Sequence, residues 1–249
     1  MSTTDPRHAV IVGCQRCGTT QLARLLDAHP QIDVAKPLRP EPKWFLDAAA
    51  SNKSPLEYRR ALFGDTRNDV LVEKSTSYFE TEAYAERIRC VLPDCSIIVL
   101  LRNPVERAIS HYCFSIENGL ETRPPEIALL GDDIPPTPPG ISVSPFRYVQ
   151  RSEYVVPLRW YCKRFRRVRI LITEKVFTDP QELADLYAWL GTDPSFRPEN
   201  WGDRANRRKL EIPIPPRVRR ELETRLLPQI ALLEKEFGLD LRCWRATSP

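Results

Sequence analysis

Residues 9–20 read AVIVGCQRCGTT, and this stretch decides the fold. An apolar run typical of a buried strand ends at Gly13, a loop of small residues leads to Gly18, and a helical pattern begins at Gln21. Backbone N–H groups at the start of a helix point toward a bound anion, and the helix dipole favours negative charge there. The stretch therefore predicts a phosphate cradle between a strand and a helix.

The loop differs from a Walker A loop. Its two glycines have the right spacing, but Thr19 stands where that motif requires lysine. The basic residue lies inside the loop, at Arg16, and Thr19 and Thr20 add two hydroxyls. We therefore expect a phosphate bound without an obligatory magnesium ion. Two alternatives stay open: ordinary turn glycines beside a solvated arginine, or a P-loop kinase or NTPase.

Cys14 and Cys17 form a C-x-x-C pair at a helix start, which is also the arrangement of thiol redox proteins. This alternative is weaker, because it leaves Gly18 and the two threonines without a role. A second Cys/His pair at ligand spacing is lacking in the sequence, so we expect no metal site.

The composition is globular: 249 residues, 42% apolar and 28% charged. A net charge of only +4 does not demand a nucleic-acid partner. No apolar run approaches the length of a membrane-spanning helix, so integral membrane contact is not expected. The polar residues 1–8 and the irregular spacing of seven cysteines predict a cytoplasmic protein with reduced thiols. The oligomeric state stays open.

Strands and helices alternate along the chain. This pattern predicts an α/β fold, a P-loop-like three-layer sandwich with a central parallel sheet and helices on both faces, in a single domain over residues 1–249. A proline-rich insertion at about 121–147 is expected to be either a substrate-facing lid or a solvent-exposed linker. Further strands are expected at 70–73, 96–101 and 168–173, and helices at 82–91, 105–118, 148–165, 182–190 and 217–237.

Cationic side chains follow three of the expected strands. Arg16 lies after the first, Lys74 follows the second, and Arg102 follows the third, with Ser110 about two helical turns further on. The carboxyl ends of parallel strands meet at one edge of a sheet, where ligands bind. We therefore expect these residues to converge on one crevice that holds phosphates at two places.

Four motifs in this order resemble those of sulfotransferases that use 3′-phosphoadenosine 5′-phosphosulfate. Residues 13–20 resemble the 5′-phosphosulfate loop, and residues 101–112 resemble the 3′-phosphate motif. Residues 41–45, EPKWF, and 73–79, EKSTSYF, are similar to segments of the heparan-sulfate-type branch. The resemblance covers residues 9–190. It implies that the nucleotide is bound by Arg16, Cys17, Gly18, Thr19, Thr20, Arg102 and Ser110.

The sequence departs from that family at three places. Arg16 stands where heparan-type members usually have lysine, and Thr76 replaces the usual proline. The C-terminal cofactor loop is not clearly matched. Arg207 and Arg208 are the candidates for it, beside Arg204, Asn206 and Lys209, with a solvated basic face as the alternative.

The resemblance implies transfer of a sulfuryl group to a hydroxyl or amine of a small-molecule, lipid or glycan acceptor, which leaves adenosine 3′,5′-bisphosphate. Arg16 and Lys74 are expected to stabilise the developing negative charge. Glu41 is the candidate base, with His111 as the alternative. Lys43 is a candidate for the acceptor side. Glu41 could instead be a surface carboxylate paired with Lys43.

Overall fold

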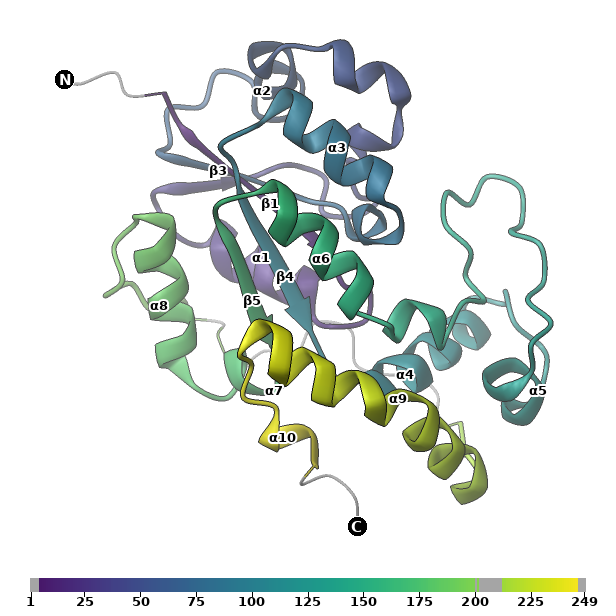
Figure 1. Cartoon of the computed structure of the whole chain (residues 1–249). Helices are drawn as coiled ribbons and strands as arrows, with labels where there is room; N and C mark the ends of the chain where they lie inside the picture. Colours follow the sequence, from purple (N-terminus) through teal and green to yellow (C-terminus); the bar gives the residue numbers. More distant parts are fainter. Residues whose placement is uncertain (1–4, 200, 202–211, 246–249) are drawn as a thin grey trace. The chain divides into compact units, whose positions relative to one another are not determined.

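The computed structural model describes residues 5–199, 201 and 212–245. Its first feature is a five-stranded sheet in the order β2-β3-β1-β4-β5, with every neighbouring pair parallel (Figure 1). The predicted parallel sheet is confirmed. Its strands are β1 (Arg7–Gly13), β2 (Ile32–Val34), β3 (Val70–Lys74), β4 (Ser96–Leu101) and β5 (Val168–Ile172).

β1 occupies the middle of the sheet, and the strand order reverses there. After β1 the chain forms β2 and β3 on one side, and then β4 and β5 on the other. Ligands of open α/β sheets bind beyond the carboxyl ends of the strands at such a reversal. Ile11 of β1 is level with Lys74 of β3 in the sheet register, so the two strands end close together.

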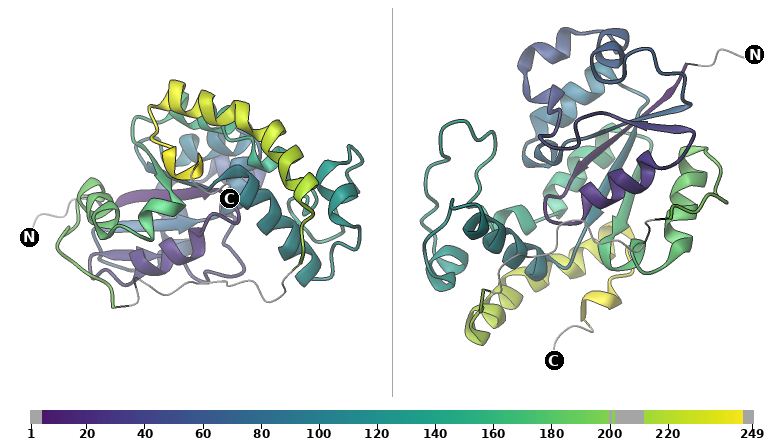
Figure 2. Two further views of the ribbon diagram at one scale, coloured as in Figure 1. Left: turned by 90° about the horizontal axis from the view of Figure 1, so that it is seen from below. Right: turned by 180° about the vertical axis from the view of Figure 1, so that it is seen from behind.

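Helices lie on both faces of the sheet. α1 (Thr19–Asp27) and α8 (Pro180–Leu190) cover one face, and α3 (Glu82–Val91) and the second half of α6 (Val155–Arg164) cover the other (Figure 2). The hydroxyl of Tyr187 in α8 donates to the carbonyl of Leu25 in α1 at 3.0 Å. The hydroxyl of Tyr161 in α6 donates to the carbonyl of Tyr78 at 2.7 Å. The predicted three-layer arrangement is confirmed.

The chain divides into two compact units. The first comprises residues 1–101 and 159–205 and holds the sheet; the second comprises residues 102–158 and 206–249. That the chain forms a single domain stays a prediction. The first unit also contains η1 (Trp44–Leu46), η2 (Ala48–Asn52), α2 (Pro55–Phe63), η3 (Thr76–Glu80) and α7 (Thr173–Val176), and the second contains α4 (Pro104–Glu117), α5 (Pro125–Leu130), η4 (Gln150–Ser152), α9 (Pro216–Phe237) and α10 (Arg242–Arg245).

The second unit has its own apolar core between α4, α5 and α9. The proline-rich segment 121–147 contributes Ala128, Leu129 and Phe146 to it, and all three side chains are buried. The carbonyl of Pro145 in the same segment accepts a hydrogen bond from the buried Ser115 hydroxyl at 2.9 Å. These contacts do not fit a solvent-exposed linker. The role of the segment as a lid stays a prediction.

The helix expected over residues 148–165 is shorter than predicted. Residues 150–152 form the isolated turn η4, and α6 begins only at Val155. Pro157 explains the boundary, because proline lacks the N–H that a helix interior needs and is tolerated only in the first turn. The periodicity of apolar residues alone did not reveal this break.

Candidate active site

The loop after β1 has the strand–loop–helix geometry predicted from the sequence. The N–H of Cys14 donates to the carbonyl of Leu100 at 2.8 Å, which fixes the loop to β4. α1 starts at Thr19, directly after Gly18, whose φ is +85°. A Cβ atom on Gly18 would lie 2.6 Å from Cε2 of Phe177, so only glycine fits there. The first-turn N–H groups of a helix have no acceptor within the helix, as an anion cradle requires.

Thr173 braces this loop from the end of β5. Its hydroxyl oxygen lies 2.7 Å from the carbonyl oxygen of Cys17 and 2.8 Å from that of Leu101. It therefore ties the predicted phosphate loop to the end of β4. We did not single out Thr173 from the sequence. The available signal was a hydroxyl residue at the end of the expected strand 168–173, much as Ser75 follows β3.

Lys74 connects the loop to Glu41. The side chain of Lys74 is 2% exposed, and its Nζ lies 2.7 Å from Oε1 of Glu41. The same Nζ lies 3.5 Å from Oγ1 of Thr20 in the first turn of α1. Lys74, Glu41 and Thr20 are thus brought together, as the strand-end argument predicted for Lys74. Their catalytic and binding roles stay predictions.

Glu41 is held in place rather than exposed at the surface. Its side chain is 15% exposed, and its ion-pair partner here is Lys74. Oε2 accepts the N–H of Thr76 at 2.9 Å, and the Thr76 hydroxyl lies 3.0 and 3.1 Å from Oε1 and Oε2. The alternative of a surface carboxylate paired with Lys43 is therefore wrong, because Lys74 of β3 and Thr76 of η3 hold Glu41 instead. Thr76, which differs from the related motif, supplies two of the donors.

A second carboxylate, Glu73, lies fully buried beneath this site. It accepts hydrogen bonds from the hydroxyls of Tyr58 at 3.0 Å, Ser75 at 2.9 Å and Tyr78. Burial raises the pKa of Glu73 from 4.5 to about 7, since the low-polarity interior disfavours the charged form more than the three donors favour it. The sequence signal was a carboxylate directly after the apolar residues Val70–Val72 and before Lys74, and we gave it no role.

Glu73 and its partners fix the segment that bears Glu41. The Ser75 hydroxyl accepts the N–H of Lys43 at 2.9 Å, and the Tyr78 hydroxyl accepts the N–H of Phe45 at 2.9 Å. Lys43 has a φ of +55°, a backbone conformation that non-glycine residues rarely adopt. The turn after Glu41 is thus pinned to the end of β3.

Arg102, Ser110 and His111 lie in the second unit. Arg102 directly follows β4, and its carbonyl accepts the Tyr154 hydroxyl at 2.9 Å. Ser110 and His111 are buried in α4, and the His111 ring packs 4.9 Å from that of Tyr148. Complete burial suits a structural histidine better than a base. The convergence of Arg102 and Ser110 with the loop stays a prediction, and Arg207 and Arg208 lie outside the described residues.

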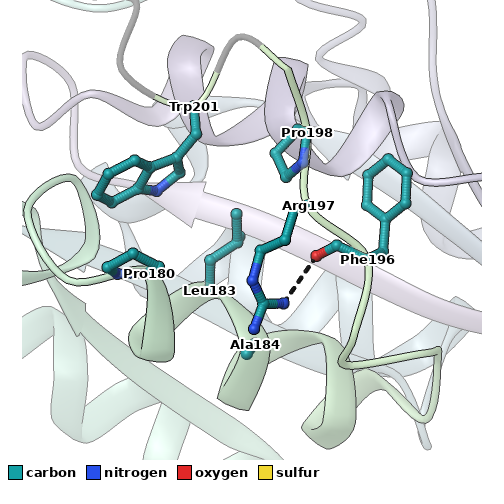
Figure 3. Close-up of a pocket in the computed structure, with 7 residues that line it drawn as sticks. All are labelled: Pro180, Leu183, Ala184, Phe196, Arg197, Pro198 and Trp201. Carbon is teal, nitrogen blue, oxygen red and sulfur yellow. Dashed lines mark hydrogen bonds between the residues drawn. The ribbon is translucent and has the colours of Figure 1, made fainter.

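A separate apolar cavity of about 170 Å³ lies in the first unit, between α8 and the segment that follows it (Figure 3). The Arg197 guanidinium donates to the carbonyls of Pro194 and Phe196 at 2.7 and 3.0 Å. None of the residues predicted for the active site lines this cavity. Its walls are formed by Pro180, Leu183, Ala184, Phe196, Arg197, Pro198 and Trp201.

Two further features concern metals and membranes. Among the described residues, no group of three or more His, Cys, Asp or Glu side chains is placed to hold a metal ion. Within the same part of the chain, no helix combines the length and apolarity needed to cross a bilayer. Cys14 and Cys17 are both buried thiols. The cytoplasmic location stays a prediction.

The chain is similar to known sulfotransferases in sequence. The family model of the sulfotransferase domain matches residues 6–181. Human heparan sulfate glucosamine 3-O-sulfotransferase 6 is 37% identical over 106 residues, which are 42% of this chain and 29% of that protein. Human heparan sulfate glucosamine 3-O-sulfotransferase 3B1 is 27% identical over 187 residues, 74% of this chain and 46% of that protein. The chain spans less than half the length of these curated relatives.

Solved structures agree with these matches. A sulfotransferase from Alicyclobacillus acidocaldarius superposes with a TM-score of 0.78 at 25% identity, over 98% of this chain and 100% of that one. The sulfotransferase domain of the Synechococcus PCC 7002 olefin synthase has a TM-score of 0.50 at 17% identity, over 96% of this chain and 98% of that one, which is a likeness of fold alone. Together, these findings confirm the resemblance seen in the sequence motifs.

Proposed function

Because the chain belongs to the sulfotransferase family, we propose that it moves a sulfuryl group from 3′-phosphoadenosine 5′-phosphosulfate to an acceptor hydroxyl or amine. The observation that carries this proposal is the series of contacts from Thr20 through Lys74 to Glu41. A helix start suited to an anion, a buried cation and a carboxylate lie in direct succession. The comparisons favour neither the P-loop kinase nor the thiol redox alternative.

The proposed reaction is an in-line displacement at sulfur. The acceptor oxygen gives an electron pair to sulfur, the bond from sulfur to the 5′-phosphate oxygen breaks, and that oxygen keeps the bonding pair. The acceptor proton passes to the carboxylate of Glu41. Lys74, Arg16 and the N–H groups of the helix start stabilise the charge on the sulfuryl and leaving oxygens. Arg16 supplies charge alone, because a guanidinium stays protonated.

The nucleotide would be held at both of its phosphate ends. Cys17, Gly18 and Thr19 would offer backbone and hydroxyl donors to the 5′ end, supported by the geometry of the loop. Arg102 and Ser110 would bind the 3′-phosphate, which suits the charge and fork geometry of arginine. Arg207 and Arg208 remain candidates for a further contact with the sulfate-donor nucleotide.

The acceptor that we place first is a glycan hydroxyl. The support is the wording of the relatives' names, which specify O-sulfation of glucosamine in heparan sulfate. A small-molecule or lipid alcohol is the second class, and an amine the third.

Binding of adenosine 3′,5′-bisphosphate tests the nucleotide site. Calorimetry on the wild type, Thr19→Ala and Arg102→Ala should show affinity falling roughly 10- to 100-fold in each variant, the value of a lost hydrogen bond to a charged group. Arg225→Ala is the control, because Arg225 pairs with Glu221 on the surface of α9. Unchanged affinity in both site variants would overturn the assignment.

Transfer of labelled sulfate tests the reaction itself. Incubation of 3′-phosphoadenosine 5′-[³⁵S]phosphosulfate with N-sulfated heparan oligosaccharides, simple alcohols and phenols should label at least one class. Transfer that survives replacement of both Cys14 and Cys17 by serine removes the redox alternative. Tight binding of ATP only with magnesium, and no affinity for the bisphosphate, would instead favour a P-loop kinase or NTPase.

A further inference from the structure

Thr76 contacts the carboxylate of Glu41 with both its backbone N–H and its side-chain hydroxyl. Its N–H donates to Oε2 at 2.9 Å, while its hydroxyl lies 3.0 Å from Oε1 and 3.1 Å from Oε2. Lys74 approaches Oε1 alone, at 2.7 Å. Thr76 therefore contacts both carboxylate oxygens, and it is itself 7% exposed.

The backbone around Thr76 is held by contacts other than its own hydrogen bonds to Glu41. The neighbouring Ser75 is fully buried, donates to Glu73 at 2.9 Å and accepts the N–H of Lys43 at 2.9 Å. The Tyr78 hydroxyl accepts the N–H of Phe45 at 2.9 Å. Groups that are locked by their surroundings can hold a reacting side chain in one geometry. Thr76 has that support.

The chemistry of the two partners of Glu41 differs. A lysine ammonium has only donors, whereas a threonine hydroxyl both donates and accepts. When Glu41 takes a proton, its attraction to Lys74 falls with its charge, and a new O–H donor needs an acceptor. The Thr76 hydroxyl can supply that acceptor, and the Thr76 N–H can still donate to the other oxygen.

We propose that Thr76 is the positioning residue of Glu41, holding the carboxylate before and after proton uptake while Lys74 serves the sulfuryl oxygens. The inference rests on the proposed transfer reaction and deepens it. In this proposal Thr76 acts through Glu41 and does not itself contact the acceptor. Its loss should reduce the rate of the chemical step and leave nucleotide binding intact.

Kinetics of transfer to an acceptor that the labelled-sulfate experiment identifies provide the first test. Thr76→Val removes the hydroxyl at nearly constant shape, and we expect kcat to fall about 10-fold or more, since small misplacements of a base are costly. KM for the sulfate donor should stay within about two-fold. Thr76→Ser keeps the hydroxyl and should recover most of the rate.

Thr192→Val is the matched control. Thr192 is 5% exposed and its hydroxyl bonds only the carbonyl of Tyr187 among its described partners, at 3.1 Å, so the same substitution removes a similarly buried group elsewhere in the first unit. We expect its kcat to equal that of the wild type. An equal loss of kcat in Thr76→Val and Thr192→Val would assign the effect to general loosening and overturn the proposal.

A thermal double-substitution cycle gives a second readout that needs no acceptor. Thr76→Val should lower Tm by about 2–4 °C in the wild type and by less than about 1 °C in Glu41→Ala, because the partner is then gone. Equal losses of Tm in the wild-type and Glu41→Ala backgrounds would overturn the proposal that Thr76 holds Glu41. A wild type that transfers sulfate to no acceptor overturns the proposed function, whereas an active wild type with unchanged kcat in Thr76→Val overturns the positioning role alone.

Discussion

Replacing Glu73 by glutamine should change how stability depends on pH. Glu73 is fully buried, and its oxygens accept hydrogen bonds from three hydroxyls. Glutamine keeps the shape and a carbonyl acceptor but does not titrate. The pKa of Glu73 is about 7 in the folded chain against 4.5 for an ordinary glutamate. Between these values the folded state holds a proton that the unfolded state has lost.

The sign and the size follow from this difference. Stability falls as pH rises wherever the folded state binds more protons, so the contribution of Glu73 is complete below pH 4.5 and is lost as pH passes 7. Each pKa unit corresponds to about 1.36 kcal/mol, which makes the loss about 3 kcal/mol. His8 acts oppositely over the same range, because burial lowers the pKa of its imidazole from 6.5 to about 4. The wild-type curve alone therefore does not isolate Glu73.

Urea unfolding of both proteins at pH 4.5 and 7.5 isolates it, because His8 is common to both. Relative to the wild type, Glu73→Gln should gain about 3 kcal/mol in free energy of unfolding between the two pH values. Glu221→Gln is the control, since Glu221 is an exposed partner of Arg225 and should show little change. The same difference between Glu73→Gln and wild type at both pH values would refute the reasoning.

Two further substitutions test the phosphate loop and the buried cation. Gly18→Ala places a Cβ 2.6 Å from Phe177 at a φ of +85°, whereas Gly238→Ala at the end of α9 has a similar left-handed φ of +64° and no atom within 4 Å of the new Cβ. Both should lose about 1–2 kcal/mol to backbone strain, but only Gly18→Ala should also lose bisphosphate affinity in calorimetry; matching affinities would contradict the loop geometry. Lys74→Met should lower kcat/KM about 100-fold or more by removing a charge that stabilises the transition state, while the exposed Lys53→Met, which breaks a surface pair, should leave it unchanged. A fully active Lys74→Met would exclude lysine from the reaction.

Local patterns in the sequence were sufficient for the sheet and the loop. The strand patterns that end at Gly13, Glu73, Leu101 and Thr173 predicted four strands that the structure contains, with ends within one residue of those observed. The spacing of Gly13 and Gly18 predicted the strand–loop–helix cradle. These features depend on side-chain periodicity and on the backbone freedom of glycine, which are properties of neighbouring residues. The same reasoning overextended the helix before α6, because periodicity does not register the break at Pro157.

The partners of the reactive side chains were decided only by the tertiary structure. Glu41 meets Lys74 and Thr76 across 33 and 35 residues of chain, and Thr173 reaches Cys17 across 156. The sequence identifies candidate site residues at the strand ends. The turn after Glu41, which forms only in the folded chain, determines which carboxylate reaches Lys74. The pKa of Glu73 likewise follows from complete burial. Burial and distant contacts arise when separate segments pack, so neighbouring residues alone do not specify them.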